Sequence, residues 1–142
     1  MHLADPTRMS SPDDYTKPLP KHDPSMQPFW DYAREGKLAA QRCRDCAHVH
    51  FPPGPVCPVC LSGRQEWFVA SGRGTLFSWV EFHHAYWDCV KPALPYNVVM
   101  VRLEEGPILV SNLVGENLSA LKLGIALEAV FEAIPGGMFI PK

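Results

Sequence analysis

Two pairs of cysteines are the residues of this chain whose spacing most directly predicts chemistry. Cys43 and Cys46 form one C-x2-C pair, Cys57 and Cys60 form a second, and ten residues separate the pairs. Each pair can clasp a metal ion from a single turn, so the four thiolates can close a tetrahedron around Zn²⁺. Four protein ligands leave no position open for water or substrate. The spacing therefore predicts a structural zinc ion held in a small ribbon.

Two other interpretations of these cysteines stay open. Disulfides are one, although the fifth cysteine, Cys89, has no sequence partner and no secretory segment precedes the pairs. Iron in a rubredoxin-like site is the other, because tetrahedral sulfur coordination suits iron as well as zinc. The sequence alone does not choose between the two metals.

A second group of polar residues contains what a Cys/His nucleophile needs, namely Glu81, His83, His84, Asp88 and Cys89. On a strand, His83 and His84 point to opposite faces, so at most one of them can serve a given cysteine. The aromatic residues around them favour a contact surface instead. We therefore expect no catalytic residues in this chain. For Cys89 three interpretations stay open: a nucleophile, a partly buried thiol or an interface residue.

Two further features have structural explanations. His48 and His50 share one face of a strand beside the first cysteine pair, and because the set of four ligands is complete we expect them to be exposed. The run Gly72-Arg73-Gly74 lacks the lysine and Ser/Thr of a phosphate-binding P-loop. Its glycines suit a bulge at the start of a strand.

Length and composition limit the classes of protein that the chain can belong to. Its 142 residues, 46% of them hydrophobic, fit one or two small domains. The net charge of −2 gives no general attraction to nucleic acid or to an anionic membrane. No apolar run reaches the roughly 18 residues of a membrane span, and the polar, Pro-rich N-terminus is unlike a signal peptide. We expect a cytoplasmic protein.

The first half of the chain divides into three segments. Residues 1–22 are polar and Pro-rich and are expected to form a flexible tail. Residues 23–36 predict a helix, with Asp23 as cap and Gly36 as stop. Residues 37–70 predict the ribbon, with strands over 37–41, 47–51 and 64–69, and with arginines near the metal that offset its thiolate charge.

Residues 71–142 predict a second, β-rich unit. Strands are expected over 75–84, 96–103, 107–113, 125–132 and 138–140, with a short helix over 117–123. Five strands with a helical insert between the third and fourth suggest an OB-fold barrel, and a sandwich remains possible. The expected fold is thus mainly β with a short N-terminal helix, a rubredoxin-like zinc ribbon and a five-stranded OB-fold barrel.

An ordered series of short motifs resembles one known family. The series is Phe29-Trp30, Gly36-Lys-Leu38, Gln41-Arg-Cys43, Phe51-Pro-Pro53, Cys57-Pro-Val-Cys60, Trp67, Ser71-Gly-Arg-Gly74 and Pro95-Tyr96. It resembles the acyl-CoA-associated zinc-ribbon/OB-fold proteins known as domain of unknown function thirty-five, over about residues 23–141. Each motif alone is weak, but their order is specific.

The resemblance implies a non-catalytic accessory subunit. Such a subunit assembles with a thiolase-like enzyme, whether a thiolase, an acyltransferase or a retro-aldolase, and completes or supports its acyl-CoA channel. Because thiolase-fold enzymes are dimers, it implies a heterotetramer of two plus two chains. Contacts with the partner or with acyl-CoA are expected from six residues: Phe29, Trp30, Arg73, Tyr86, Trp87 and Tyr96.

Two hypotheses from other classes remain. A ribbon and an OB fold also suit a single-stranded nucleic-acid-binding module, since stacked bases use aromatic platforms. The acidic balance of the chain and its scattered Arg and Lys residues speak against this alternative. A rubredoxin-like electron carrier is the third hypothesis, and it requires iron at the four cysteines.

Overall fold

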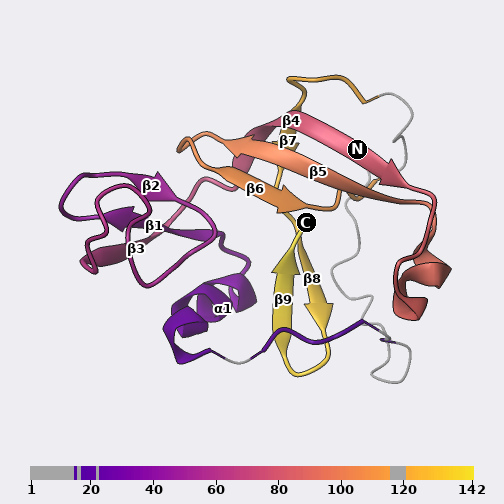
Figure 1. Cartoon of the computed structure of the whole chain (residues 1–142), viewed down its shortest axis with the longest axis horizontal. Coiled ribbons are helices and arrows are strands. Elements are labelled where there is room, and N and C mark those ends of the chain that lie inside the picture. Colours follow the sequence, from indigo (N-terminus) through magenta and orange to yellow (C-terminus); the bar gives the residue numbers. More distant parts are fainter. Residues whose placement is uncertain (1–14, 16, 22, 116–120) are drawn as a thin grey trace.

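The computed structural model describes residues 15, 17–21, 23–115 and 121–142. It is mainly β with one short α-helix, as the sequence predicts, and Figure 1 shows the arrangement. The elements are η2 (Pro24–Met26), α1 (Gln27–Arg34), β1 (Ala39–Cys43), β2 (Val49–His50), β3 (Gln65–Val69), β4 (Arg73–Phe82), η3 (Asp88–Ala93), β5 (Tyr96–Leu103), β6 (Ile108–Ser111), β7 (Ala126–Glu128), β8 (Phe131–Ile134) and β9 (Met138–Pro141).

The N-terminal helix begins where its sequence signals place it. The Asp23 carboxylate accepts a hydrogen bond from the Ser25 N–H at 2.9 Å and so caps the short turn η2. Pro28 lies in the first turn of α1, where a missing N–H costs nothing. Gly36 has a φ of 71° and ends the helix. The helix packs against β1 and β9, and it therefore joins the ribbon to the end of the chain.

The ribbon is a three-stranded antiparallel sheet in the order β2-β1-β3. Gln41 in the central strand β1 lies opposite His50 on one side and Trp67 on the other. The Gln41 side chain is buried, and its amide oxygen accepts a hydrogen bond from the Gly54 N–H at 2.8 Å. This bond ties the Pro-rich loop between the two cysteine pairs to the sheet.

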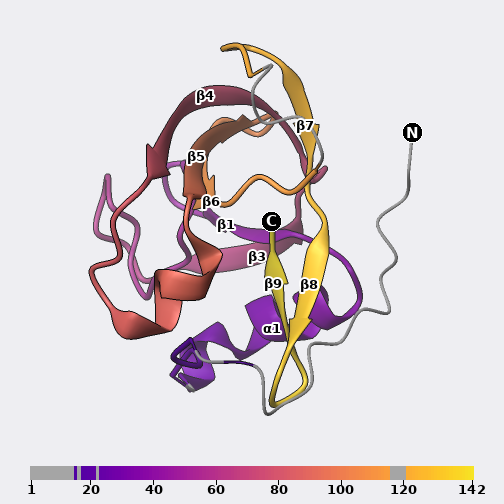
Figure 2. The same ribbon diagram turned by 90° about the vertical axis from the view of Figure 1, so that its right-hand side faces the viewer.

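The OB-fold unit is built on a four-stranded antiparallel sheet in the order β6-β5-β4-β7. Figure 2 shows β4 and β5 curving strongly around the interior, with the hairpin β8–β9 on the open side. The register shifts between Leu76 and Ser78, which leaves Phe77 as a bulge in β4. A bulge increases local twist, so it helps the long strand to curl.

One expected strand is divided in two, which corrects the sequence prediction. Residues 125–132 were expected to form a single strand, but β7 ends at Glu128 and β8 begins at Phe131. β7 pairs with β4, whereas Val130 exchanges two hydrogen bonds with Lys142, of 2.9 and 2.7 Å. The strand breaks because the chain changes its pairing partner here. Most of the helix expected over 117–123 lies outside the described residues.

The helix, the ribbon and the OB-fold sheet share one hydrophobic core. Its buried members are Phe29, Leu38, Ala70, Leu76, Val99, Val101, Leu103 and Leu109. These residues come from α1, from the entry and exit of the ribbon, and from β4 to β6. Because the core is shared, the ribbon is held at a fixed position on the barrel.

Most of the expected N-terminal tail lies outside the described residues. Within its described part, Tyr15 is half-buried. Burial raises the pKa of its phenol, and the nearby Glu132 carboxylate raises it further. No helix in the described ranges is long and apolar enough to cross a membrane.

Candidate metal centre and aromatic surface

The side chains of Cys43, Cys46, Cys57 and Cys60 converge on one point. Their four Sγ atoms lie within 4.8 Å of one another, with 3.5 Å between Cys43 and Cys60 and 3.6 Å between Cys46 and Cys57. Four thiolates at the usual Zn–S bond length of about 2.3 Å form a tetrahedron with edges of about 3.8 Å. The arrangement therefore fits a tetrahedrally coordinated metal ion.

The two cysteine turns, here called the first and second knuckles, have the same backbone design. In the first knuckle, residues 43–47, the Asp45 N–H points at the Cys43 sulfur at 3.4 Å. In the second, residues 57–61, the Val59 N–H points at the Cys57 sulfur at the same distance. Backbone N–H groups aimed at sulfur stabilise thiolate over thiol, so the turns are prepared for metal binding.

The four thiols titrate as a mutually dependent group. Burial raises the pKa of Cys43, but a hydrogen bond from the Cys46 backbone N–H and bonds with the other thiols lower it overall, to about 7. The Ser62 backbone N–H lowers the pKa of Cys60, yet contacts with neighbouring thiols and burial outweigh it and raise the pKa to about 12. Each negative charge opposes the next, so four thiolates require a cation.

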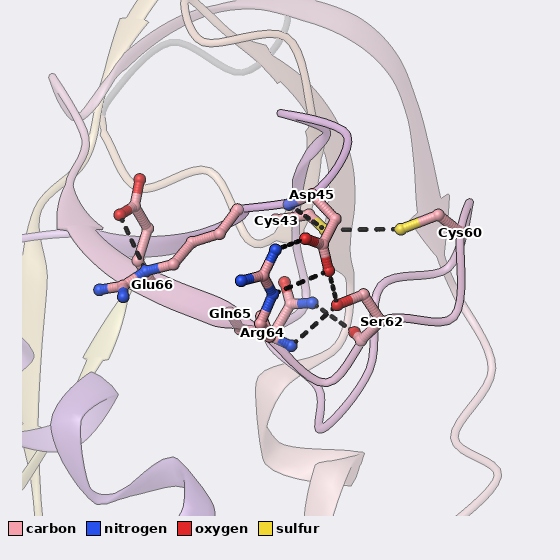
Figure 3. A network of polar contacts seen from close by, with 8 residues as sticks. Cys43, Asp45, Cys60, Ser62, Arg64, Gln65 and Glu66 are labelled. Carbon is pink, nitrogen blue, oxygen red and sulfur yellow. Dashed lines mark hydrogen bonds and ion pairs between the residues drawn. The ribbon is translucent and has the colours of Figure 1, made fainter.

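A polar network joins the two knuckles (Figure 3). Asp45, in the first knuckle, accepts hydrogen bonds from the Ser62 hydroxyl and from the Arg64 guanidinium, both of which follow the second knuckle. Backbone pairing supports the same link, because the Arg44 N–H donates to the Arg64 carbonyl at 2.9 Å. Sequence reasoning missed Asp45 and Ser62, and a carboxylate inside a C-x-D-C turn was the available signal.

The arginines near the cluster are paired with carboxylates. Arg42 and Arg44 lie 3.9 and 3.4 Å from the Glu66 carboxylate, and Arg64 pairs with Asp45. Arg42 also lies over the Phe68 ring at 4.7 Å. These carboxylates neutralise part of the arginine charge, so less of it is left for the expected role of offsetting the thiolates.

The two ribbon histidines differ from each other. Their rings are stacked, with centroids 6.1 Å apart, so they share one face as expected. His50, however, is buried, and its expected exposure is wrong. Its Nε2 lies 3.0 Å from the Gln65 side-chain oxygen and its Nδ1 lies 3.3 Å from the Pro52 carbonyl. His50 therefore connects the Pro-rich loop to β3.

Aromatic residues gather at the far end of β4 and β5. Phe82 and Tyr96 stack with ring centroids 5.0 Å apart, and Tyr86 meets the edge of Phe82 at 6.4 Å. Tyr86 and Trp87 are 67% and 68% exposed. We call Phe82, Tyr86, Trp87 and Tyr96 the aromatic surface. The two most exposed rings lie on a loop whose base is fixed by stacking.

The other expected contact residues lie elsewhere. Phe29 is 6% exposed and meets the Trp30 ring at 5.0 Å, so it serves the core of this chain. Trp30 is half-buried against that core. Arg73, 65% exposed in its side chain, pairs with Glu104 at 3.2 Å, and both residues line a surface pocket of about 430 Å³. The structure thus brings Tyr86, Trp87 and Tyr96 together and places Phe29, Trp30 and Arg73 apart from them.

The polar residues near Cys89 have their own partners. His83 pairs with Glu81 at 2.7 Å, and Asp88 pairs with Lys91 at 2.6 Å. The His84 ring meets the edge of Tyr86 with centroids 5.2 Å apart. Cys89 lines a pocket of about 450 Å³ together with Trp87, Val90, Ile134, Ile140 and residues of the N-terminal segment.

Gly74 has a steric role in the Ser-Gly-Arg-Gly motif. A Cβ at this position would lie 2.5 Å from the Arg102 carbonyl oxygen and 2.7 Å from a Val101 methyl group. Only glycine lets β4 and β5 approach each other here. The preceding Gly72 has a φ of 72°. The expected conformational role of these glycines agrees with both observations.

A closed four-cysteine ribbon that shares its core with an OB-fold barrel defines the class of this protein. Family comparison agrees over most of the chain. The ChsH2 rubredoxin-like zinc ribbon domain matches residues 30–65, and the ChsH2 C-terminal OB-fold domain matches residues 67–132. A DUF35 domain-containing scaffold protein from Pyrococcus furiosus is 31% identical over 109 residues, which cover 75% of this chain and 77% of that protein. The chain belongs to the DUF35 family.

Two other similar proteins are parts of enzymes by name. The probable enoyl-CoA hydratase alpha subunit of Thermomonospora curvata is 37% identical over 98 residues. That match covers 68% of this chain, which spans only 30% of the length of the hydratase subunit. The solved structure described as the Ltp2-ChsH2(DUF35) aldolase is similar with a TM-score of 0.73 and 29% identity, covering 87% of this chain and 95% of the other.

Proposed function

We propose that this chain is a non-catalytic, zinc-binding subunit of a thiolase-like enzyme that acts on acyl-CoA. The partner is a thiolase, an acyltransferase or a retro-aldolase, and it carries the chemistry. This chain completes or supports the partner's active site or CoA channel. Because metal binding requires the four ribbon cysteines to stay reduced, we further propose a compartment that keeps thiols reduced, the cytoplasm.

The observation that carries the proposal is the exposure of Tyr86 and Trp87. Two large aromatic side chains, each about two-thirds exposed, stand next to each other on a loop anchored by the Phe82–Tyr96 stack. A monomeric protein rarely leaves such a cluster in water, whereas aromatic residues are enriched at the centres of protein interfaces. The aromatic surface is thus the best candidate for the partner contact.

The comparisons support an accessory role. The similar proteins include a scaffold protein and a hydratase alpha subunit, and the similar solved structure is described as an aldolase with two named components. The hydratase and aldolase descriptions link proteins with this kind of domain to enzymes of acyl-CoA or aldol chemistry, and the scaffold description is compatible with a supporting role. We extend the role to the present chain, with a two-plus-two assembly as the proposed stoichiometry, and with Trp30 and Arg73 as further contacts to the partner or to acyl-CoA.

Zinc is the metal we propose for the four cysteines. Their sulfur tetrahedron is complete, so the bound ion would have no open position and its role would be structural. The ribbon contributes few residues to the core, and structural zinc is worth on the order of 10 kcal/mol to small domains of this kind. Metal analysis of protein purified without added metal tests this: a colourless zinc protein is expected, and visible absorbance from iron would favour an electron carrier.

The accessory role is tested by co-expression with a thiolase-fold enzyme of the same genome, followed by affinity capture and an acyl-CoA turnover assay. We expect a stable complex whose turnover falls when this chain is omitted. The double variant Tyr86→Ser/Trp87→Ser should lose the complex while its thermal unfolding stays unchanged. Phe77→Ala, which removes a 46% exposed aromatic side chain elsewhere on β4, is the matched control.

Absence of both the complex and any effect on turnover would remove the proposal. Binding of single-stranded DNA at micromolar protein, weakening steeply with salt, would instead favour the nucleic-acid alternative.

A further inference from the structure

Leu61 has an unfavourable backbone conformation and an exposed side chain. It follows Cys60 with a φ of 62°, and its side chain is 75% exposed. The left-handed region costs a residue with a Cβ about 1 kcal/mol or more, and Gly or Asn usually occupies it. A branched aliphatic residue in this place loses stability and gains no burial within the chain.

The first knuckle shows that the turn does not need a leucine. Ala47 holds the equivalent place after Cys46, with a φ of 60°. Its N–H donates to the Cys43 carbonyl at 2.9 Å, just as the Leu61 N–H donates to the Cys57 carbonyl at 3.0 Å. The positive φ belongs to the knuckle design, whereas the large side chain is particular to the second knuckle. Leu61 combines a strained backbone with an exposed side chain that adds nothing to the core. This combination indicates that the side chain has a function.

Leu61 is one of three exposed aliphatic residues around the second knuckle. Val59 is 65% exposed and Val56 is 45% exposed. We call Val56, Val59 and Leu61 the knuckle tip. Single exposed apolar residues are ordinary, whereas exposed apolar residues that gather on one loop can mark an interaction site. A metal ion held by Cys57 and Cys60 would restrain the loop, so less conformational entropy would oppose its binding to a partner.

The arginines near the ribbon cysteines are paired with carboxylates. Arg64 pairs with Asp45, and Arg42 and Arg44 share the Glu66 carboxylate, so each of these three guanidinium groups has a carboxylate partner. The tip therefore offers apolar surface without a free cationic patch. Such a surface is complementary to an uncharged, apolar recess on a protein and unsuited to a phosphate backbone.

We propose that the knuckle tip inserts into an apolar recess of the partner enzyme subunit, as a second point of attachment. This inference rests on the proposed function. In Figure 1 the ribbon lies at one end of the molecule and the η3 loop beside the aromatic surface lies at the other. Attachment at both ends fixes the orientation of the chain on the enzyme, which one contact alone does not.

The test compares Leu61→Asn with Ala47→Asn. Both changes relieve the same backbone strain, because asparagine tolerates a positive φ, and neither touches a cysteine. Both variants should keep their zinc and a Tm equal to that of the wild type or up to about 3 °C higher. Only Leu61→Asn should weaken binding to the co-expressed thiolase-fold enzyme, by about tenfold in Kd. Val59→Ser, which leaves the strained residue untouched, should weaken binding to a similar extent.

Three outcomes would overturn the inference. If Leu61→Asn and Val59→Ser bind the enzyme as the wild type does, the knuckle tip is no contact, although the proposed function stands. If Leu61→Asn lowers the Tm while Ala47→Asn does not, the leucine is structural. If the wild-type chain itself captures no enzyme, the proposed function and this inference fall together.

Discussion

Asp45 in the first knuckle is bonded to Arg64, which follows the second knuckle, through two guanidinium nitrogens. The pair joins two segments that are 19 residues apart in sequence, one from each cysteine pair. The Ser62 hydroxyl donates to the same carboxylate. Contacts outside the ligand set orient the ligands of structural metal sites, so this pair is expected to act on metal retention more than on the fold.

Replacing Asp45 by alanine should speed the loss of zinc. The Arg64 side chain is 71% exposed and that of Asp45 is 34% exposed, so the pair itself contributes only about 1 kcal/mol or less to unfolding. Loss of the carboxylate also frees the Ser62 and Arg64 segment from the first knuckle. We expect several-fold faster transfer of zinc to a chromophoric chelator. Arg44→Ala, which removes a pair with Glu66 that does not join the knuckles, is the control and should transfer zinc at the wild-type rate.

Zinc affinity should fall as the pH falls. At pH 8 the Cys43 thiol, with a pKa of about 7, is mostly ionised, whereas Cys60, with a pKa of about 12, is protonated. At pH 6 both thiols carry protons that zinc must displace, so binding releases more protons at pH 6 than at pH 8. Competition titrations at both pH values measure the affinity, and calorimetry in buffers of different ionisation heat measures the protons. Affinity that is independent of pH would contradict the assignment.

Replacing Gly74 by alanine should destabilise the OB-fold sheet. A Cβ would lie 2.5 Å from a backbone oxygen of β5, and backbone cannot move aside as a side chain can. Forced overpacking of this kind costs about 1–3 kcal/mol, which chemical unfolding would measure. Gly63→Ala is the control, because the nearest atom to its Cβ is 4.0 Å away. Equal stability of the two variants would show that the strands can separate freely.

The local features of this fold could be predicted from the sequence, because they depend on neighbouring residues. The C-x2-C turns, the cap at Asp23 and the strand Tyr96–Leu103 each depend on residues close in sequence, and each appears in the structure. The break at Ala129 and Val130 could not be predicted. It arises from partners distant in sequence, since the Ala129 N–H donates to Gly72 and Val130 pairs with Lys142.

The candidate site was predictable to a similar degree. Spacing indicated the four cysteines, and composition indicated the aromatic loop. The sequence indicated that Phe29 packs against apolar groups, but not whether these belong to this chain or to a partner. The structure places Phe29 in the core of this chain. His50 was expected to be exposed because the set of four cysteine ligands is complete without it. Contacts from Pro52 and Gln65 bury it, and neither contact follows from sequence spacing.

Asn97 should be a strong stabilising contact of the OB-fold unit. It is 9% exposed, its side-chain N–H donates to the Leu113 carbonyl at 2.9 Å, and its oxygen accepts from the Leu113 N–H at 2.6 Å. Asn97→Ala leaves both backbone groups of Leu113 without these partners, at a cost of about 2 kcal/mol or more. A lower midpoint of urea unfolding and faster hydrogen exchange at the Leu113 amide are expected.

Val98→Ala is the matched control for this prediction. Val98 is the next residue of β5, points to the opposite face of the sheet and is half-buried, so its truncation should cost less and leave the Leu113 amide protected. The two variants separate a loss of packing in β5 from the loss of the hydrogen bonds that hold the segment after β6. Unchanged exchange at Leu113 in Asn97→Ala would mean that other contacts fix this segment, and Asn97 would then be an ordinary buried side chain.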